Sequence, residues 1–173
     1  MQSRGGIRTQ SSKPVKFTPQ IPRRCCWLTK TIYYRMWRGG GGFPNFRSKS
    51  GVIINARAET ALDKKTFRES LLSRRCVIPS TGFFEWTKTG AKKKYLFRET
   101  GKSLLYMAGI YNDYGNERRY VILTTDANQS VQEIHIRMPV IVHQQEIGDW
   151  IKNETAMYKI LERVPPVLTA AQA

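Results

Sequence analysis

After Gly51, short runs of β-branched and aromatic residues recur at close spacing and predict a series of strands. The first run, Val52-Ile53-Ile54, passes into Asn55-Ala56-Arg57-Ala58-Glu59 without a turn residue. Glycines between later runs supply turns, which favours antiparallel hairpins. The turn glycines are Gly90, Gly101 and Gly115, and the later predicted strands are Cys76–Ile78, Gly82–Thr87, Lys94–Arg98, Ser103–Tyr111, Arg118–Thr124 and Met138–Val142.

Helical patterns are confined to three stretches. Phe67 and Leu71 form an apolar pair four residues apart, and either Asp63 or a box made by Thr66 and Glu69 is expected to cap that helix. The strands and helices together predict an α+β fold, a single compact β-rich domain of mainly antiparallel strands with short flanking helices. The predicted helices are 63–73, 128–134 and 144–163.

The first fifty residues lack this regularity. They contain four consecutive glycines, Gly39 to Gly42, and scattered prolines, and only Thr31–Trp37 has a strand-like pattern. Residues 1–58 hold twelve Lys and Arg and no acidic residue, the first being Glu59. We therefore predict a basic, irregular segment over residues 1–50 and a folded domain over residues 51–165.

Length and composition narrow the class of protein. A chain of 173 residues suits one domain, and a hydrophobic content of 40% excludes a fully disordered chain. The net charge of +16 favours a polyanionic partner, first of all nucleic acid, although a ribosomal-type RNA binder or a membrane-surface protein would share that charge. No run approaches the roughly 20 apolar residues of a membrane helix, and the first residues lack the apolar run of a secretory signal, so we expect a cytoplasmic protein. We also expect it to be nucleoid-associated and monomeric.

Cysteine spacing argues against a disulfide framework and against a metal site. Cys25 and Cys26 are adjacent and Cys76 is distant, which gives no CxxC pair. We expect neither a structural metal nor a cofactor.

One polar face is predicted in the first strand. Alternation sends Asn55, Arg57 and Glu59 to one side, and the alanines between them to the other. The guanidinium can hold a phosphate while the amide donates to a reacting oxygen. The alternative is a polar sheet face stabilised by an Arg57–Glu59 ion pair.

Gly82-Phe83-Phe84-Glu85-Trp86 places one carboxyl group among aromatic residues. If Glu85 is poorly solvated, its pKa rises toward neutrality, as a general acid requires. The alternative is an edge-strand glutamate pointing to water. Trp86 is either a core residue or a stacking platform for an unpaired base.

His135 lies between a predicted helix and the next strand, where an imidazole can shuttle protons or be merely structural. The other histidine, His143, has no neighbour to orient it. Cys76 is expected to be buried and inert, and its alternative role is the nucleophile of a thiol hydrolase with His135. Lys92-Lys93-Lys94 is expected to be a solvated hairpin with some value as a phosphate contact.

Five blocks, taken in order, resemble the SOS response-associated peptidase (SRAP) family. The resemblance covers residues 51 to about 151, and the first 50 residues match poorly. The blocks are Asn55-Ala56-Arg57-Ala58-Glu59-Thr60, Arg74-Arg75-Cys76-Val77-Ile78-Pro79, Gly82-Phe83-Phe84-Glu85-Trp86, Ala108-Gly109-Ile110-Tyr111 and Ile134-His135-Ile136-Arg137-Met138-Pro139-Val140.

The resemblance implies a protein that binds single-stranded DNA and captures abasic sites in the DNA-damage response. Family members join the ring-opened sugar aldehyde to an N-terminal cysteine as a thiazolidine. By position, Asn55 resembles the family's active-site asparagine, Glu85 its acid/base glutamate and His135 its active-site histidine. The positions that resemble its DNA contacts are Arg57, Trp86, Thr124 and Arg137.

The family pattern begins Met-Cys-Gly-Arg, whereas this sequence begins Met1-Gln2-Ser3-Arg4. We therefore expect thiol trapping to be lost, while a free α-amine can still form a Schiff base. A frameshifted start would also explain the acid-free first third. The rival hypothesis is a non-catalytic binder of single-stranded nucleic acid that has lost the nucleophile.

Overall fold

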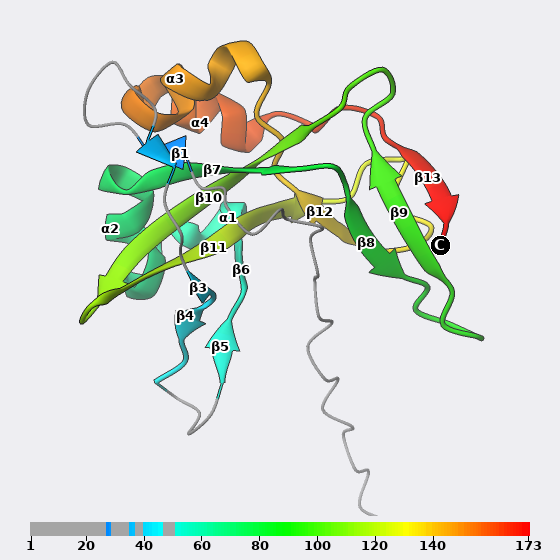
Figure 1. The fold of residues 1–173 in the computed structure, drawn as a ribbon, viewed down its shortest axis with the longest axis horizontal. Helices are drawn as coiled ribbons and strands as arrows, with labels where there is room; N and C mark the ends of the chain where they lie inside the picture. Colours follow the sequence, from blue (N-terminus) through cyan, green and yellow to red (C-terminus); the bar gives the residue numbers. More distant parts are fainter. Residues whose placement is uncertain (1–26, 29–34, 37–39, 47–50) are drawn as a thin grey trace, which may run out of the picture.

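The computed structural model describes residues 27–28, 35–36, 40–46 and 51–173, and a mixed eight-stranded sheet forms its centre (Figure 1). Six strands follow the order β12-β11-β10-β7-β1-β2, and β3 and β6 pair with β11 in parallel. The strands are β1 (Trp27–Leu28), β2 (Arg35–Met36), β3 (Gly40–Gly41), β6 (Asn55–Arg57), β7 (Arg75–Ser80), β10 (Leu105–Tyr114), β11 (Glu117–Asp126) and β12 (Arg137–Pro139).

Two smaller sheets complete the β structure. The three-stranded sheet has the order β13-β9-β8 and is entirely antiparallel. Its strands are β8 (Phe83–Trp86), β9 (Lys94–Arg98) and β13 (Thr169–Gln172), and the two-stranded sheet pairs β4 (Phe43–Pro44) with β5 (Val52–Ile53).

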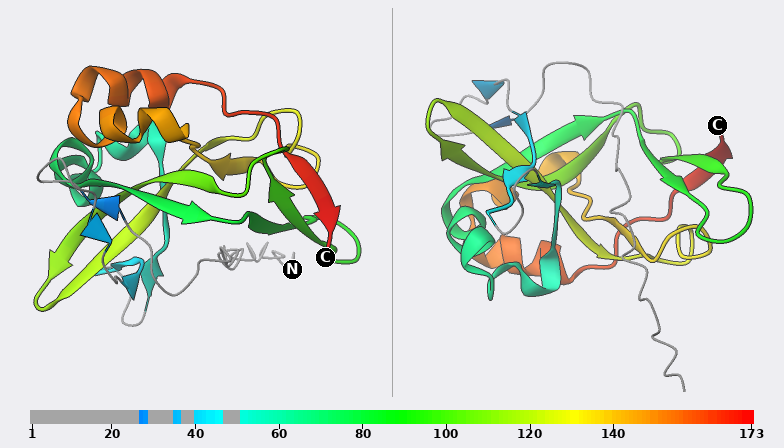
Figure 2. Two further views of the ribbon diagram at one scale, coloured as in Figure 1. Left: turned by 45° about the horizontal axis from the view of Figure 1, so that its top comes forward. Right: turned by 90° about the horizontal axis from the view of Figure 1, so that it is seen from below.

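The helices gather at the side of the molecule away from the three-stranded sheet (Figure 2). α2 presents the buried side chains of Phe67 and Leu71, the predicted apolar pair, to the main sheet. The helical elements are α1 (Ala58–Ala61), α2 (Lys65–Ser73), the 3-10 turn η1 (Gln144–Glu146), α3 (Ile147–Lys152) and α4 (Glu154–Glu162).

Both faces of the main sheet are buried, one against the helices and the other against the three-stranded sheet. Side chains alternate along the central strands, so Val121 and Leu123 of β11 join the helix-side cluster while Ile122 joins the opposite one. The opposite cluster includes Phe83 and Phe97, which stack with ring centroids 5.2 Å apart and attach the three-stranded sheet.

The register of β6 decides which face carries the predicted polar residues. Ala56 pairs with Leu123, and both belong to the helix-side cluster. Asn55 and Arg57 therefore point to the opposite face, the one that also receives β8. We call this the site face.

The structure confirms the α+β class, the mainly antiparallel pairing and the three turn glycines, each of which has a positive φ. Lys94–Arg98 is a strand with the predicted bounds, and four other predicted strands appear with shifted ends. The predicted strand Met138–Val142 ends early, as β12. Of the strand-like stretch Thr31–Trp37, only β2 lies among the described residues. The strand β13 was not predicted.

The first predicted strand divides at Ile54 into β5, which pairs with β4, and β6, which pairs with β11, and its last two residues are not in a strand. Ala58 and Glu59 begin the helix α1, although the alternation of buried and exposed side chains continues through them. The following helix begins at Lys65 rather than at Asp63, and its N-cap Lys64 makes no side-chain capping bond.

One further helix prediction is wrong, and another is confirmed except for a break. Residues 129–134 form turns rather than the predicted helix. Asn128 accepts from the backbone and hydroxyl of Ser130, as an N-cap does, and Gln132 N–H bonds to the Asn128 carbonyl, but no regular helix follows. The predicted helical tail is broken at Asn153, whose extended backbone ends α3 and whose side chain caps α4 by accepting from Ala156 N at 3.1 Å.

Within the part of the chain that the structure describes, every helix is too short or too polar to cross a membrane.

Candidate functional site

Glu85 is buried on the site face. It lies in β8 between Phe84 and Trp86, with Phe83 on its own side of the strand, and it is 3% exposed. Its Oε2 atom is buried and has no hydrogen-bond partner among the described residues. Desolvation raises the pKa of Glu85 to about 7, against smaller lowering effects of the Trp86 backbone and of Lys88. The predicted poor solvation of this carboxyl group is confirmed.

The structure brings His135 to Glu85, although fifty positions separate them in the sequence. The imidazole Nδ1 lies 3.8 Å from Glu85 Oε1, close but beyond hydrogen-bond distance. The backbone N–H of Arg137 donates to the same Nδ1 at 3.1 Å. The Arg137 carbonyl oxygen lies 3.0 Å from the same Nδ1, so this nitrogen accepts from the N–H in one tautomer and donates to the carbonyl in the other.

Asn55 shares the site face but is hydrogen-bonded to neither of these two residues within the described structure. Its side-chain carbonyl oxygen is buried and has no partner there. An orphaned amide oxygen of this kind is uncommon in a folded protein and is available to a ligand. Arg57, two residues further along β6, is exposed.

Trp86 lies beside a lysine on the β8–β9 hairpin. The two strands pair Trp86 directly with Lys94, whose ammonium lies 3.7 Å from the ring centroid of Phe84 and 5.8 Å from that of Trp86. The indole is partly exposed, so an aromatic surface with a cation beside it faces outward.

Arg137 is the most heavily bonded of the predicted DNA contacts. Its guanidinium makes two hydrogen bonds to Glu59, at 2.7 and 3.0 Å, and others to Asp126 and to the Thr124 carbonyl. The Thr124 side chain is buried, and its hydroxyl donates to the Ala56 carbonyl at 3.4 Å. These DNA-contact assignments stay predictions.

Glu59 has a different partner from the predicted one. The alternative of an Arg57–Glu59 ion pair on a sheet face is wrong, because Glu59 binds Arg137, 78 positions away. From the sequence, Glu59 is only the third polar residue on the strand face that carries Asn55 and Arg57. No local pattern marks a pair of that separation.

Cys76 is fully buried in β7, beneath the same face. Gly109 lies opposite it in β10, where an added Cβ would collide with the Ile78 side chain. The floor of the site is therefore closely packed, and the thiol is shielded from solvent. This burial favours the inert-thiol interpretation over the thiol hydrolase.

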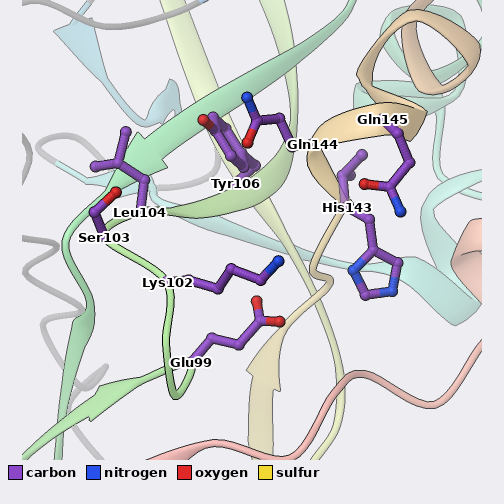
Figure 3. Close-up of a pocket in the computed structure, with 9 residues that line it drawn as sticks. Glu99, Lys102, Ser103, Leu104, Tyr106, His143, Gln144 and Gln145 are labelled. Carbon is purple, nitrogen blue, oxygen red and sulfur yellow. The ribbon is translucent and has the colours of Figure 1, made fainter.

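A shallow pocket lies away from these residues, between the β9–β10 turn and η1 (Figure 3). Glu99, Lys102, Tyr106 and His143 are among its lining residues, and none of the predicted site residues is. The candidate site is therefore separate from this pocket. Among the described residues, no group of three or more His, Cys, Asp or Glu side chains is placed to hold a metal ion.

A protein-family model described as SOS response associated peptidase (SRAP) matches residues 31–172. The chain is 38% identical over 115 residues to "Abasic site processing protein YoaM" of Bacillus subtilis, a match that covers 61% of this chain and 51% of the relative. It is 32% identical over 108 residues to "Abasic site processing protein YedK" of Escherichia coli, covering 59% and 48%. The chain thus spans about half the length of these curated relatives.

Solved structures agree on the fold. A protein from Bacteroides thetaiotaomicron is 29% identical, with a TM-score of 0.69 over 86% of this chain and 73% of the other. A protein from Bordetella bronchiseptica, 24% identical, has a TM-score of 0.72 over 88% and 85% of the two chains. The second likeness supports the fold alone.

Proposed function

Because the chain belongs to the SOS response-associated peptidase family, we propose that it binds single-stranded DNA and captures abasic sites as part of the DNA-damage response. Two relatives carry abasic-site processing in their names, which supports the choice of substrate. The net charge of +16 supports a polyanionic partner.

One observation carries the proposal: a buried, poorly solvated carboxyl group lies 3.8 Å from an imidazole that comes from a distant part of the chain. Glu85, with a pKa of about 7, is protonated in a large fraction of molecules at neutral pH and can act as a general acid. His135 is the proton carrier beside it. The orphaned Asn55 oxygen on the same face is an acceptor for the N–H of an attacking amine.

The proposed covalent step is Schiff-base formation. A primary amine of the protein attacks C1′ of the ring-opened sugar aldehyde and gives a carbinolamine. Glu85 then donates its proton to the departing hydroxyl, which leaves as water, and the C=N bond of a protonated imine forms. His135 relays protons during opening of the sugar ring. This step uses a primary amine and needs no thiol.

Non-catalytic binding of single-stranded nucleic acid is the second candidate. The outward aromatic surface of Trp86 beside Lys94 favours it, because bases stack on such a surface without any chemistry. The exposed Arg57 would contact the phosphate backbone in either case.

The test is trapping with borohydride. We expect an adduct between the protein and abasic single-stranded DNA that survives denaturing electrophoresis only when the imine is reduced to a secondary amine. Glu85→Gln removes the acidic proton and keeps the shape of the side chain, so we expect at least about a hundredfold slower trapping. Intact single-stranded DNA should bind to both proteins equally.

The matched control is Glu162→Gln, which alters an exposed glutamate at the end of α4. It should trap DNA at the wild-type rate. Binding without any reducible adduct would contradict the capture proposal and leave the non-catalytic binder. Preference for RNA over single-stranded DNA in competition would contradict the proposed DNA substrate and favour a basic RNA-binding protein.

A further inference from the structure

We propose that Glu59 is a positioning residue that acts through Arg137 to fix the orientation and tautomer of the His135 imidazole. The inference rests on the proposed function only for the role of His135 in chemistry. The contacts among Glu59, Arg137 and His135 are present in the protein without DNA. Glu59 lies in the first sequence block of the family resemblance but has no part in the proposed reaction.

We call the contact between Glu59 and Arg137 the clamp, and it is made at two points. The two oxygens of Glu59 accept from the two terminal nitrogens of Arg137 at 3.0 and 2.7 Å, in the parallel arrangement that suits a planar guanidinium. Thr125 donates its hydroxyl to Glu59 at 3.1 Å and fixes the carboxylate further. Three bonds therefore hold this side chain in one orientation.

The contact joins separate elements of the fold. Glu59 belongs to α1, which follows β6, whereas Arg137 begins β12 on the other side of β11. The guanidinium also donates to the Thr124 carbonyl of β11 at 2.6 Å. Glu59 thus ties the start of β12 to the strand that carries Asn55.

The backbone of Arg137 connects the clamp to the His135 imidazole. The Arg137 N–H donates to His135 Nδ1 at 3.1 Å, and the Arg137 carbonyl lies 3.0 Å from the same nitrogen. These two groups belong to successive peptide units, so a change in the Arg137 backbone that moves one of them away from Nδ1 would favour the tautomer that bonds to the other. The position of Arg137 therefore decides which imidazole nitrogen carries the proton.

Asp126 contributes less to this clamp. Its carboxylate also accepts from Arg137, but its side chain is 87% exposed and lies on β11, which β12 already meets through the sheet. Surface ion pairs of this kind add little. Glu59, in contrast, connects Arg137 to another part of the fold, the helix α1.

The test is NMR of the protein with ¹⁵N-labelled histidine, without DNA. The sequence has only two histidines, so the His135 nitrogens are readily assigned by comparison with a His143→Gln variant. In the wild type we expect a protonated Nε2 and an unprotonated Nδ1 at His135. In Glu59→Gln we expect the two nitrogen shifts to move toward each other as the tautomers mix.

The matched control is Glu117→Gln. Glu117 also pairs with an arginine, Arg119, through two bonds at 2.8 and 3.1 Å, and it lies at the opposite end of β11. Both substitutions remove one negative charge, so a change in Glu59→Gln that is absent from Glu117→Gln supports the clamp. Unchanged His135 shifts in Glu59→Gln, or equal changes in both variants, would overturn it.

Two further variants keep the test decisive. Glu59→Asp retains the charge with a shorter reach and should give an intermediate shift. If Glu59→Gln does not fold, Arg137→Lys, which keeps the backbone amide but loses the planar fork, should mix the tautomers in the same way. Should it leave the His135 shifts unchanged, the clamp is refuted.

Trapping of abasic DNA separates this inference from the proposed function. We expect Glu59→Gln to slow trapping about tenfold, with a hundredfold as the upper end for a misplaced proton carrier. If the wild type forms no adduct, the proposed function fails while the NMR result still decides the role of Glu59.

Discussion

Two carboxylates on either side of the His135–Arg137 segment show how environment assigns different tasks to the same residue type. Glu85 is buried in β8, with one oxygen lacking any partner among the described residues. Glu59 is partly exposed in α1, and both of its oxygens are bonded to Arg137. The first environment suits a proton donor, and the second suits a fixed anion.

The pKa directions follow from these surroundings. Burial raises the pKa of Glu85 to about 7 because little nearby compensates for the lost hydration. Partial burial alone would also raise the pKa of Glu59, but hydrogen bonds and charge attraction from Arg137, with a bond from Thr125, hold it below its ordinary value. Desolvation therefore sets the direction of the pKa shift at Glu85, and the bonds to Arg137 and Thr125 set it at Glu59.

The largest expected effect concerns Glu85 and stability at neutral pH. Since the folded-state pKa is raised from 4.5 to about 7, the folded protein binds more protons than the unfolded chain between these values. Its free energy of unfolding should therefore fall as pH rises through this window, by roughly 3 kcal/mol in all. Urea unfolding of the wild type and Glu85→Gln at pH 5 and pH 8 measures this, and the variant should lose most of the difference.

Glu162→Gln is the control, and it should keep the wild-type pH dependence because its carboxylate is exposed. An identical decline in Glu85→Gln and the wild type would show that Glu85 is not the group that titrates, and the contrast between the two carboxylates would disappear.

Sequence reasoning succeeded where the cause was local. Aromatic neighbours on both sides of Glu85 indicated poor solvation, because a short strand between such residues offers few ways to water, and the carboxyl group is indeed buried. The break at Asn153 also had a local cause, since its carboxamide caps α4, but helical periodicity alone hid it. Recognising Asn153 as an N-cap would have found this break.

Features that depend on pairing between distant segments were not predicted from the sequence. The strand β13 consists of small and polar residues and exists because β9 offers it an edge. The Glu59–Arg137 pair depends on β6 and β12 both lying against β11, which no pattern within either segment predicts. The proximity of Glu85 and His135 was expected only from the family resemblance.

Two arginines, Arg57 and Arg137, also differ in their surroundings. Arg137 already has carboxylate partners, whereas Arg57 is exposed on the same face. If Arg57 contacts a phosphate, Arg57→Ala should weaken binding of single-stranded DNA a few-fold. The slope of log affinity against log salt should shrink by about 0.7. Titration at several salt concentrations measures both.

Arg68→Ala is the matched control, because Arg68 is an exposed arginine on α2, the helix that packs on the opposite face of the sheet. It should leave the slope unchanged. Equal losses in the two variants would mean that DNA is held by net charge alone, with no preferred face.

The smallest expected effect belongs to Glu59 and appears at acid pH. A carboxylate whose folded-state pKa is lowered stabilises the protein above its unfolded-state pKa, and that contribution disappears as pH falls through the folded-state value. Because the pair is partly exposed, we expect less than about 1 kcal/mol. The wild type should therefore lose more stability than Glu59→Gln between pH 5 and pH 3 in urea unfolding. This acid-side loss has the opposite sign to the Glu85 effect, so one pH series on the two glutamine variants distinguishes a buried proton donor from a paired anion, and a Glu59→Gln curve parallel to the wild type would remove the second half of that distinction.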